Sequence, residues 1–362
     1  MEKHYELIVK DLNSDKEIEE YKTHLKKEWN NNVYYSYEYL IYFIDKRSST
    51  LKYFLFKSFD EIVVLMPFIV RDITIDNKRT SYFDVISPYG YSGPLFADSL
   101  ANETILQFWR YVDRWYKKHN IITEFIRFSL NSCHRYYSGK LIPALKNVKG
   151  TIVDEKLQWS KFKPKVRNNY RKSIQYGLTI KIYHHPITLN IIQEFFDIYI
   201  LTMHRNNADY QFFNKVDYFK KLITENSENS IIAMVYKDDI PISTELILKV
   251  DDTIYSYLGG TLSDYFYTRP NDFLKIEVLN WARKRAFKYY VLGGGREDDD
   301  GLYKYKKAFF PTDDDKIFYT GRKIIDTDVY KMLTKTVSDT SLDLEQLDSS
   351  GFFPLYRLND DS

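Results

Sequence analysis

The order of apolar runs between residues 230 and 293 constrains the fold of this chain most. Two long apolar segments and the shorter IYSYLGGT are separated by the turns KDD and VDD, the pattern of a three-strand antiparallel meander. An amphipathic segment follows, with Asn271 or Asp272 as the expected N-cap, and then the strand YYVLGGG. A meander followed by a helix, a strand and another helix predicts an α/β unit with mixed strand pairing.

The first half of the chain predicts a second unit of the same general class. LKYFLFKSF and EIVVLMPFIVRDITI form a hairpin pattern, residues 102–120 an amphipathic helix, and IITEFIRFSL a buried strand. Residues 81–96 are rich in proline and glycine, and they predict a rigid loop that presents Tyr89 and Tyr91. That loop is either a binding device or a packed Ω-loop. The expected fold class is α/β (α+β), with a mixed central sheet flanked by helices in each half.

Length and composition suggest two domains and a tail. The 362 residues suffice for two domains of about 150–200 residues each. We expect boundaries at residues 1–150, 151–335 and 336–362. The last segment is acidic and contains few apolar residues before FFPLY, where Phe352 and Phe353 are expected to dock the tail or a partner.

Whole-chain properties exclude several classes of protein. The formal net charge of +2 gives no general attraction to nucleic acid, so any anion site must be local. The single cysteine, Cys133, excludes an internal disulfide framework and is expected to be a packing residue. The N-terminus lacks the apolar core of a signal peptide, and no run approaches ~18 apolar residues. We expect a cytoplasmic protein, with peripheral membrane contact left open.

A block of basic residues opens the second half. No acidic residue occurs between Lys156 and Gln193, and a helix that begins after Pro164 places Arg167 and Arg171 on one face. Because arginine binds phosphate in a bidentate manner, this face, with Lys172, predicts an anion site. The alternative is a solvated helix face.

The segment 291–311 joins three glycines to a short lysine-bearing helix. Gly293, Gly294 and Gly295 allow a ligand to approach the backbone closely. The nearby lysines provide positive charge for an anionic or carbonyl group. The acidic run 298–300 is expected to be a solvated loop, and we expect no metal site.

Taken in order, several segments resemble one known family. They are FDVISPYGYSGPL, EFIRF, KPKVRNNYRKSIQYG, YILTMHRNNADYQFF, YSYLGGT and LGGG…DGLYKYKKAF. Across about residues 30–330 the chain is similar to the FemA/FemB/FemX-like branch of the GNAT acyltransferase superfamily. The resemblance implies tandem GNAT-like domains that move an aminoacyl or acyl group onto an amine of a cell-wall or surface-glycan precursor, such as a peptidoglycan precursor.

The resemblance also implies roles for individual residues. Tyr305 and Lys306 match an aromatic–lysine pair whose amine faces the developing oxyanion, and residues 167–172 match a segment that contacts phosphate. The proton acceptor is open among Asp84, Glu245 and the substrate itself. The expected substrate contacts are Tyr89, Tyr91, Arg167, Arg171, Lys172, Arg205, Tyr257, Gly294 and Gly295.

The donor stays open between two carriers. The loop R/Q-x-x-G-x-G/A, with which acetyl-CoA-dependent GNAT enzymes bind pyrophosphate, is absent from both halves. We therefore expect no tightly bound cofactor, with aminoacyl-tRNA or acyl-CoA as donor substrate and a phosphate-bearing glycan or peptidoglycan precursor as acceptor. The alternatives are an acyl-CoA-dependent N-acetyltransferase of amino sugars and a non-catalytic RNA- or glycan-binding relative.

Overall fold

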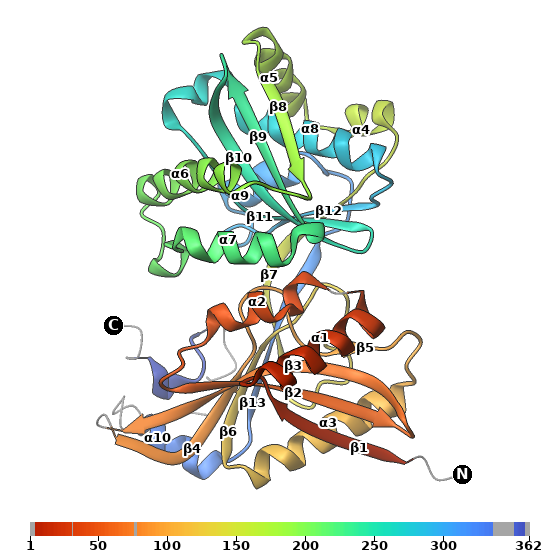
Figure 1. The fold of residues 1–362 in the computed structure, drawn as a ribbon, viewed down its shortest axis with the longest axis vertical. Coiled ribbons are helices and arrows are strands. Elements are labelled where there is room, and N and C mark those ends of the chain that lie inside the picture. The colour runs from red at the N-terminus through yellow and green to blue at the C-terminus, as the bar shows by residue number, and fades with distance from the viewer. Residues whose placement is uncertain (1–3, 31, 76–77, 336–350, 359–362) are drawn as a thin grey trace. The chain divides into compact units, whose positions relative to one another are not determined.

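The computed structural model describes residues 4–30, 32–75, 78–335 and 351–358. It divides into two compact units (Figure 1): unit 1 is Met1–Ala144 with Ile317–Ser362, and unit 2 is Leu145–Lys316. The chain leaves unit 1 within β7 (Lys140–Thr151) and returns within β13 (Lys316–Ile324). The boundaries 1–150 and 151–335 remain a prediction about independently folding domains. Most of the expected acidic tail, 336–362, lies outside the described residues.

Unit 1 is built on one mixed sheet with the strand order β1-β2-β3-β4-β6-β13. The pairing of β4 with β6 is parallel, and the other pairings along this order are antiparallel. Short β5 pairs with β3. The elements are β1 (Tyr5–Asp11), α1 (Asp15–Trp29), η1 (Val33–Tyr35), α2 (Tyr37–Leu40), η2 (Ile41–Phe43), β2 (Ser49–Ser58), β3 (Glu61–Ile75), β4 (Lys78–Ile86), β5 (Leu95–Phe96), α3 (Asn102–Lys118), β6 (Ile121–Arg127), β13, α10 (Thr327–Lys335) and η7 (Leu355–Arg357).

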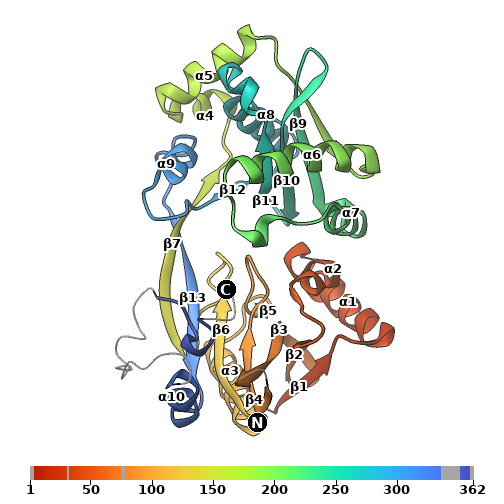
Figure 2. The same cartoon turned by 90° about the vertical axis from the view of Figure 1, so that its left-hand side faces the viewer.

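Helices cover both faces of this sheet (Figures 1 and 2). On one face the apolar stripe of α3 packs Phe108 against Phe54 and Phe56 of β2. On the other face Tyr21 of α1 meets Tyr53 edge to face, with ring centroids 5.0 Å apart. Alternation of side chains along β2 therefore supplies both cores. The expected hairpin β2–β3 and the expected helix α3 are confirmed.

A buried carboxylate joins the C-terminal segment to the sheet of unit 1. Asp84 on β4 is fully buried, and its oxygens lie 2.7 Å from Nε of Arg71 and 2.5 Å from Nε of Arg357. The hydroxyl of Tyr356 donates to the same carboxylate at 3.1 Å. Phe353 is also buried, so the segment around FFPLY docks onto unit 1 itself.

Unit 2 has a second mixed sheet with the order β7-β12-β11-β10-β9-β8. Only the pairing of β11 with β12 is parallel among these strands. The predicted meander corresponds to β9, β10 and β11 and is confirmed. The elements are β7, α4 (Glu155–Lys161), α5 (Pro164–Gln175), β8 (Thr179–His184), α6 (Leu189–Arg205), η3 (Tyr210–Phe212), α7 (Val216–Glu225), η4 (Ser227–Asn229), β9 (Ser230–Lys237), β10 (Ile240–Val250), β11 (Thr253–Thr261), η5 (Ser263–Thr268), α8 (Pro270–Lys284), β12 (Tyr289–Gly293) and α9 (Gly301–Lys307).

Helices α6 and α8 cover opposite faces of the unit 2 sheet (Figure 2). Glu245 of β10 reaches Lys275 of α8, whereas a side chain at Gly260 of β11 would collide with the Ile198 carbonyl of α6. The predicted N-cap of α8 is wrong by two to three positions. Arg269 occupies the N-cap with a positive φ of 60°, and Pro270 begins the helix, since proline suits the first helical position.

Asp84 provides a test of what stabilises unit 1. We expect Asp84→Asn to lower the free energy of unfolding by about 3–5 kcal/mol, because it leaves two partly buried arginines without the buried carboxylate that they share. Urea unfolding measures the change. Asp60→Asn, in the exposed β2–β3 turn, is the matched control and should lie within about 0.5 kcal/mol of the parent. An Asp84→Asn protein as stable as its parent would contradict this role.

Candidate active site

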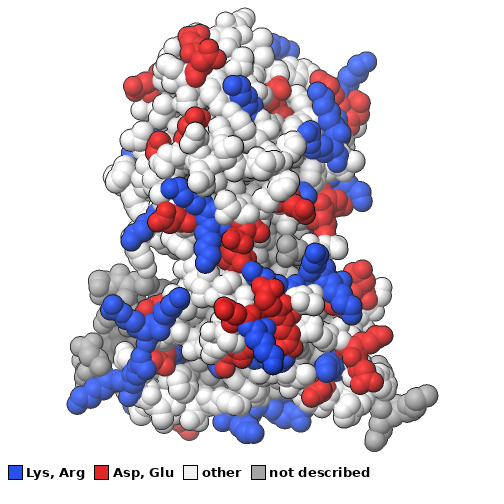
Figure 3. All heavy atoms as spheres, in the orientation of Figure 1, with Lys and Arg blue, Asp and Glu red and all other residues white. Residues whose placement is uncertain are grey.

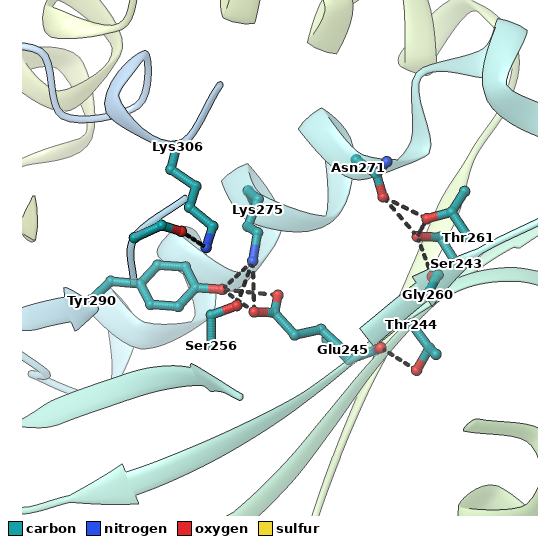
Figure 4. A network of polar contacts seen from close by, with 12 residues as sticks. Ser243, Thr244, Glu245, Ser256, Gly260, Thr261, Asn271, Lys275, Tyr290 and Lys306 are labelled. Carbon is teal, nitrogen blue, oxygen red and sulfur yellow. Dashed lines mark hydrogen bonds and ion pairs between the residues drawn. The ribbon is translucent and has the colours of Figure 1, made fainter. Parts of the chain in front are cut away.

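Strands β11 and β12 part after a short parallel pairing. Their register covers only Thr253–Tyr255 opposite Tyr289–Val291, although β11 continues to Thr261. Tyr257 is the extra residue of a bulge opposite β10, and Gly293 ends β12 with a φ of 77°. Both irregularities turn the two strands away from each other. Two lysine amines occupy the place where the strands separate (Figure 4).

Lys306 is the first of these amines. It lies on α9, and its Nζ donates to the Gly294 carbonyl at 2.6 Å. Burial, followed by the positive charge of Lys275, lowers the pKa of Lys306 to about 8. Helix α9 is fixed by Asp300, which accepts from the amides of Tyr303 and Arg296. Helix α9 therefore holds the partly buried Lys306 amine at the end of β12.

Lys275 is the second amine, and it belongs to a buried network. Its Nζ lies 2.6 Å from Oε1 of Glu245 and 2.9 Å from the Ser256 hydroxyl. Tyr290 of β12 donates to both oxygens of Glu245, at 3.0 and 2.9 Å. Burial raises the pKa of Tyr290 well above its ordinary range, so the phenol stays protonated. Glu245, which the sequence left open as a proton acceptor, is engaged by a cation and a phenol.

A pocket of about 620 Å³ opens where α5, α8 and α9 meet. We call it the α8 pocket, and its charged residues are Lys163, Lys165, Arg269, Lys304 and Asp272. Both α5 and α8 begin at this pocket with a basic N-cap residue and without a side-chain cap. Helix N-termini favour negative charge, so basic N-caps here leave a positive site. Its composition fits phosphate groups.

Two polar side chains in the α8 pocket have unusual surroundings. The Tyr305 hydroxyl is buried and has no hydrogen-bond partner among the described residues, and burial raises its pKa well above the ordinary value. Burial also raises the pKa of Asp272 to about 6, against the opposing effect of a hydrogen bond from Asn169 at 3.2 Å. A buried hydroxyl without a hydrogen-bond partner lowers the stability of the folded protein, and a bound ligand that accepts from it would remove this cost.

The predicted basic residues of α5 point elsewhere. Arg167 donates from Nη1 to the carbonyls of Ser160 and Phe162, and so closes the C-terminus of α4. Arg171 is exposed, bonds Asn168 and lies over the Trp159 ring, and Lys172 lies over Tyr176. None of the three lines the α8 pocket, to which this segment contributes Lys163, Lys165, Val166 and Asn169.

Three further predicted contacts of unit 2 also have structural partners. Arg205 donates to the Thr261 carbonyl at 2.5 Å and covers the Phe266 ring. The hydroxyl of Tyr257 meets that of Tyr218 on α7 at 2.6 Å. A side chain at Gly295 would collide with Asp300, which explains the glycine there. Of the predicted site residues, the structure brings Lys306 together with Gly294. It places Tyr305, the residue before Lys306, in the lining of the α8 pocket.

The remaining predicted residues lie in unit 1. Asp84 holds two arginines and is fully buried, so the structure gives it a stabilising role, and we propose no catalytic one. Tyr89 is 37% exposed, and Tyr91 lies edge to face with Tyr34 and Phe318. Residues that sequence reasoning did not select are Lys165, Arg269, Asp272 and Lys275. In the sequence, α5 and α8 each begin with a proline that directly follows a basic residue, in KPK and TRPND. This pattern could have indicated the regions around Lys165 and Arg269.

Comparison with known proteins agrees with this geometry. Residues 160–307 match the family described as acetyltransferase (GNAT) domain. The crystal structure of FemX superposes with a TM-score of 0.63 at 11% identity, covering 90% of this chain and 99% of that chain. A conserved protein of unknown function from Bacteroides thetaiotaomicron superposes with a TM-score of 0.54 at 13% identity, covering 89% of this chain and 100% of that chain. L-PGS from Bacillus licheniformis superposes with a TM-score of 0.50 at 12% identity, covering 75% of this chain and 84% of that chain. No curated protein matches the sequence.

These findings describe a likeness in sequence and in fold. Residues 160–307 match an acetyltransferase (GNAT) domain, and the fold of the whole chain resembles that of FemX, with two mixed sheets flanked by helices. The resemblance and the fold class stated from the sequence are confirmed. A GNAT domain implies a donor of the acyl-CoA type in general. In the described part of the chain, no helix has both the length and the apolar character needed to span a bilayer.

The two lysines generate a prediction about charge. Lys275→Met removes a neighbouring positive charge from Lys306 and leaves Glu245 unpaired, and both changes favour protonated Lys306. We expect the Lys306 pKa to rise from about 8 towards the ordinary lysine value of about 10.4. Glu245→Gln should have the opposite effect and lower the Lys306 pKa below about 8, because it removes a negative charge that favours the protonated amine. Carbon-13 NMR of labelled lysine measures each titration.

Lys304→Met serves as the control for this titration, because Lys304 lies on the same helix but is exposed and does not shift the Lys306 pKa. An unchanged Lys306 titration in Lys275→Met would contradict the coupling of the two amines.

Proposed function

We propose that this chain is an N-acyl or aminoacyl transferase that moves an activated acyl or aminoacyl group onto an amine of a cell-wall or surface-glycan precursor. The observation that carries the proposal is the partly desolvated Lys306 amine at the point where β11 and β12 part. In a GNAT-like sheet this place offers both backbone groups and a cation to an acyl carbonyl. The resemblance to FemX in fold supports an acceptor of this kind.

The chemistry assigned to Lys306 is stabilisation of an oxyanion. The acceptor amine attacks the carbonyl carbon, a C–N bond forms, and the carbonyl oxygen gains negative charge. A charged amine already held in place by Gly294 can donate to that oxygen without first being reorganised. The intermediate then collapses, and the bond between the acyl carbon and the leaving oxygen or sulfur breaks.

Tyr305 is assigned to the leaving group. Its hydroxyl is protonated, buried and without a partner among the described residues. Its proton passes to the departing oxygen or sulfur, which leaves as the alcohol or thiol, and the phenolate takes a proton back from solvent. The nitrogen of the product releases its own proton to solvent or to a group of the substrate.

The α8 pocket is assigned to the phosphates of the donor. Two uncapped helix starts and four basic side chains surround it, and it adjoins Tyr305. This arrangement also favours the alternative donor, acyl-CoA, whose pyrophosphate has the size and charge to occupy such a site. Thermal shift with CoA and with tRNA distinguishes the two carriers, because a bound ligand raises apparent stability.

The role of Lys306 predicts a large loss of rate. We expect Lys306→Met to lower kcat about 10²–10³-fold, with little change in donor KM, because the donated hydrogen bond strengthens only in the transition state. Lys284→Met, an exposed lysine at the end of α8, is the control. Activity of the parent should also fall as pH rises through about 8, where Lys306 loses its charge. A folded Lys306→Met enzyme with parental kcat would refute the assignment.

The α8 pocket predicts anion binding that depends on pH. Asp272 is mostly neutral below its pKa of about 6 and charged above it. Sulfate, whose charge is constant over this range, should therefore bind about three- to tenfold more tightly at about pH 5.5 than at about pH 7.5. Isothermal titration measures the two affinities.

Two variants separate the contributions to this binding. Asp272→Asn should bind sulfate tightly at both pH values, because the carboxylate no longer repels the anion. Arg269→Gln should weaken binding at both. A parent protein with the same affinity at both pH values would show that Asp272 does not face the anion.

A further inference from the structure

Arg127 in unit 1 contacts two aromatic rings and forms no ion pair with a residue that the structure describes. It ends β6, and its guanidinium carbon lies 4.8 Å from the centroid of the Phe125 ring and 5.7 Å from that of Tyr89. The side chain makes no hydrogen bond or ion pair with any residue that the structure describes. Burial, with the positive charge of Arg71 adding to it and Tyr89 opposing it, lowers the pKa of Arg127 to about 10.

The loop that carries Tyr89 is bonded to the backbone of Arg127 on both sides. The Arg127 amide donates to the Ser87 hydroxyl at 2.9 Å, and its carbonyl accepts from the Ser92 amide at 3.0 Å. Gly90 and Gly93, with φ of 85° and 93°, let the chain turn tightly between these anchors. The tyrosine is therefore held beside the guanidinium by the loop and not by chance contact.

The positive charge of Arg127 is not balanced by a nearby carboxylate among the described residues. The strand register places Asp84 opposite Thr123, and Thr123 and Arg127 share one face of β6 because they are four residues apart. Asp84 is the carboxylate of this face, and Arg71 and Arg357 already occupy it. No described acid is left to neutralise Arg127.

The geometry around the guanidinium fits one kind of ligand. Two aromatic rings lie near the guanidinium, and its N–H donors have no acceptor among the described residues. A carboxylate or a phosphate accepts two such donors in one plane. The exposed part of the Tyr89 ring, next to Phe43 at 5.9 Å, offers an apolar surface to a ring attached to that anion.

We propose that Arg127 and Tyr89 of unit 1 form a binding site for the anionic group of a sugar, either a sugar phosphate or a sugar carboxylate. The site is separate from the α8 pocket of unit 2, which we assign to the donor. Its identity as the anchor for the acceptor rests on the proposed transferase function. The binding itself does not, because it requires neither donor nor turnover.

Isothermal titration of the full chain tests the site directly. The probes are glucose 1-phosphate, glucuronate and neutral methyl glucoside. Arg127→Gln should weaken binding of the anionic sugars about ten- to a hundredfold, the usual effect of losing a charge-assisted pair. The neutral sugar should bind no worse. Preference for glucose 1-phosphate identifies a phosphate ligand, preference for glucuronate a carboxylate ligand, and equal dependence on Arg127 supports the shared chemistry.

Matched variants test whether binding depends on Arg127 and Tyr89 in particular. Arg114 is an exposed arginine whose guanidinium lies 4.1 Å from the Tyr111 ring, so Arg114→Gln removes a similar cation–ring pair from another surface and should not change the affinity. Tyr89→Leu should weaken the anionic sugars in a folded protein even where Arg127→Gln fails to fold. Anionic sugars that bind Arg127→Gln and Tyr89→Leu as tightly as the parent, or whose binding is lost only in Arg269→Gln, would overturn the proposal. Loss of transfer with intact Arg127-dependent binding would instead count against the transferase function.

Discussion

The separation of β11 from β12 is the constraint on which the candidate active site depends. The parallel pairing ends at Tyr255 and Val291, and beyond it the Gly294 carbonyl accepts from Lys306. The bulge at Tyr257 and the positive φ of Gly293 lie just beyond this pairing. The gap is then filled by a buried ion pair between Lys275 and Glu245 and by the Lys306 amine on a backbone carbonyl. Irregular strands thus create the polar interior that catalysis needs.

The α8 pocket shows the same relation between local cost and function. Helices that begin with Lys163 and Arg269 place a positive side chain where the helix already carries partial positive charge. Such starts are unfavourable in the free protein, and an anion in the pocket removes the conflict. The face drawn in Figure 3 carries both signs of charge and is not uniformly basic, so attraction of an anion to that face has to be local.

Sequence reasoning predicted what periodicity and turn residues determine. The meander, α3, the start of α5 at Pro164 and the glycines after β12 follow from patterns a few residues long. The α8 pocket could not be predicted that way, because segments near residues 165, 270 and 305 meet only in the folded unit. The start of α8 was misplaced because Arg269 adopts a left-handed conformation that asparagine and aspartate prefer. Asp84 and Arg167 were selected by residue type, which does not reveal that both are satisfied by protein groups.

The arginines discussed above fall into two kinds: those whose N–H donors are bonded to protein acceptors, and those whose charge is not balanced by nearby acids. Arg167 donates to carbonyls at the end of α4, and Arg71 and Arg357 share the buried Asp84, so an added anion would gain little from them. Arg127 and the basic rim of the α8 pocket differ, since their positive charge exceeds the acids around them. A bound anion there replaces missing contacts and competes with none. The density of basic residues along the chain is therefore a poor guide to ligand sites, and unmet donors in poorly hydrated places are a better one.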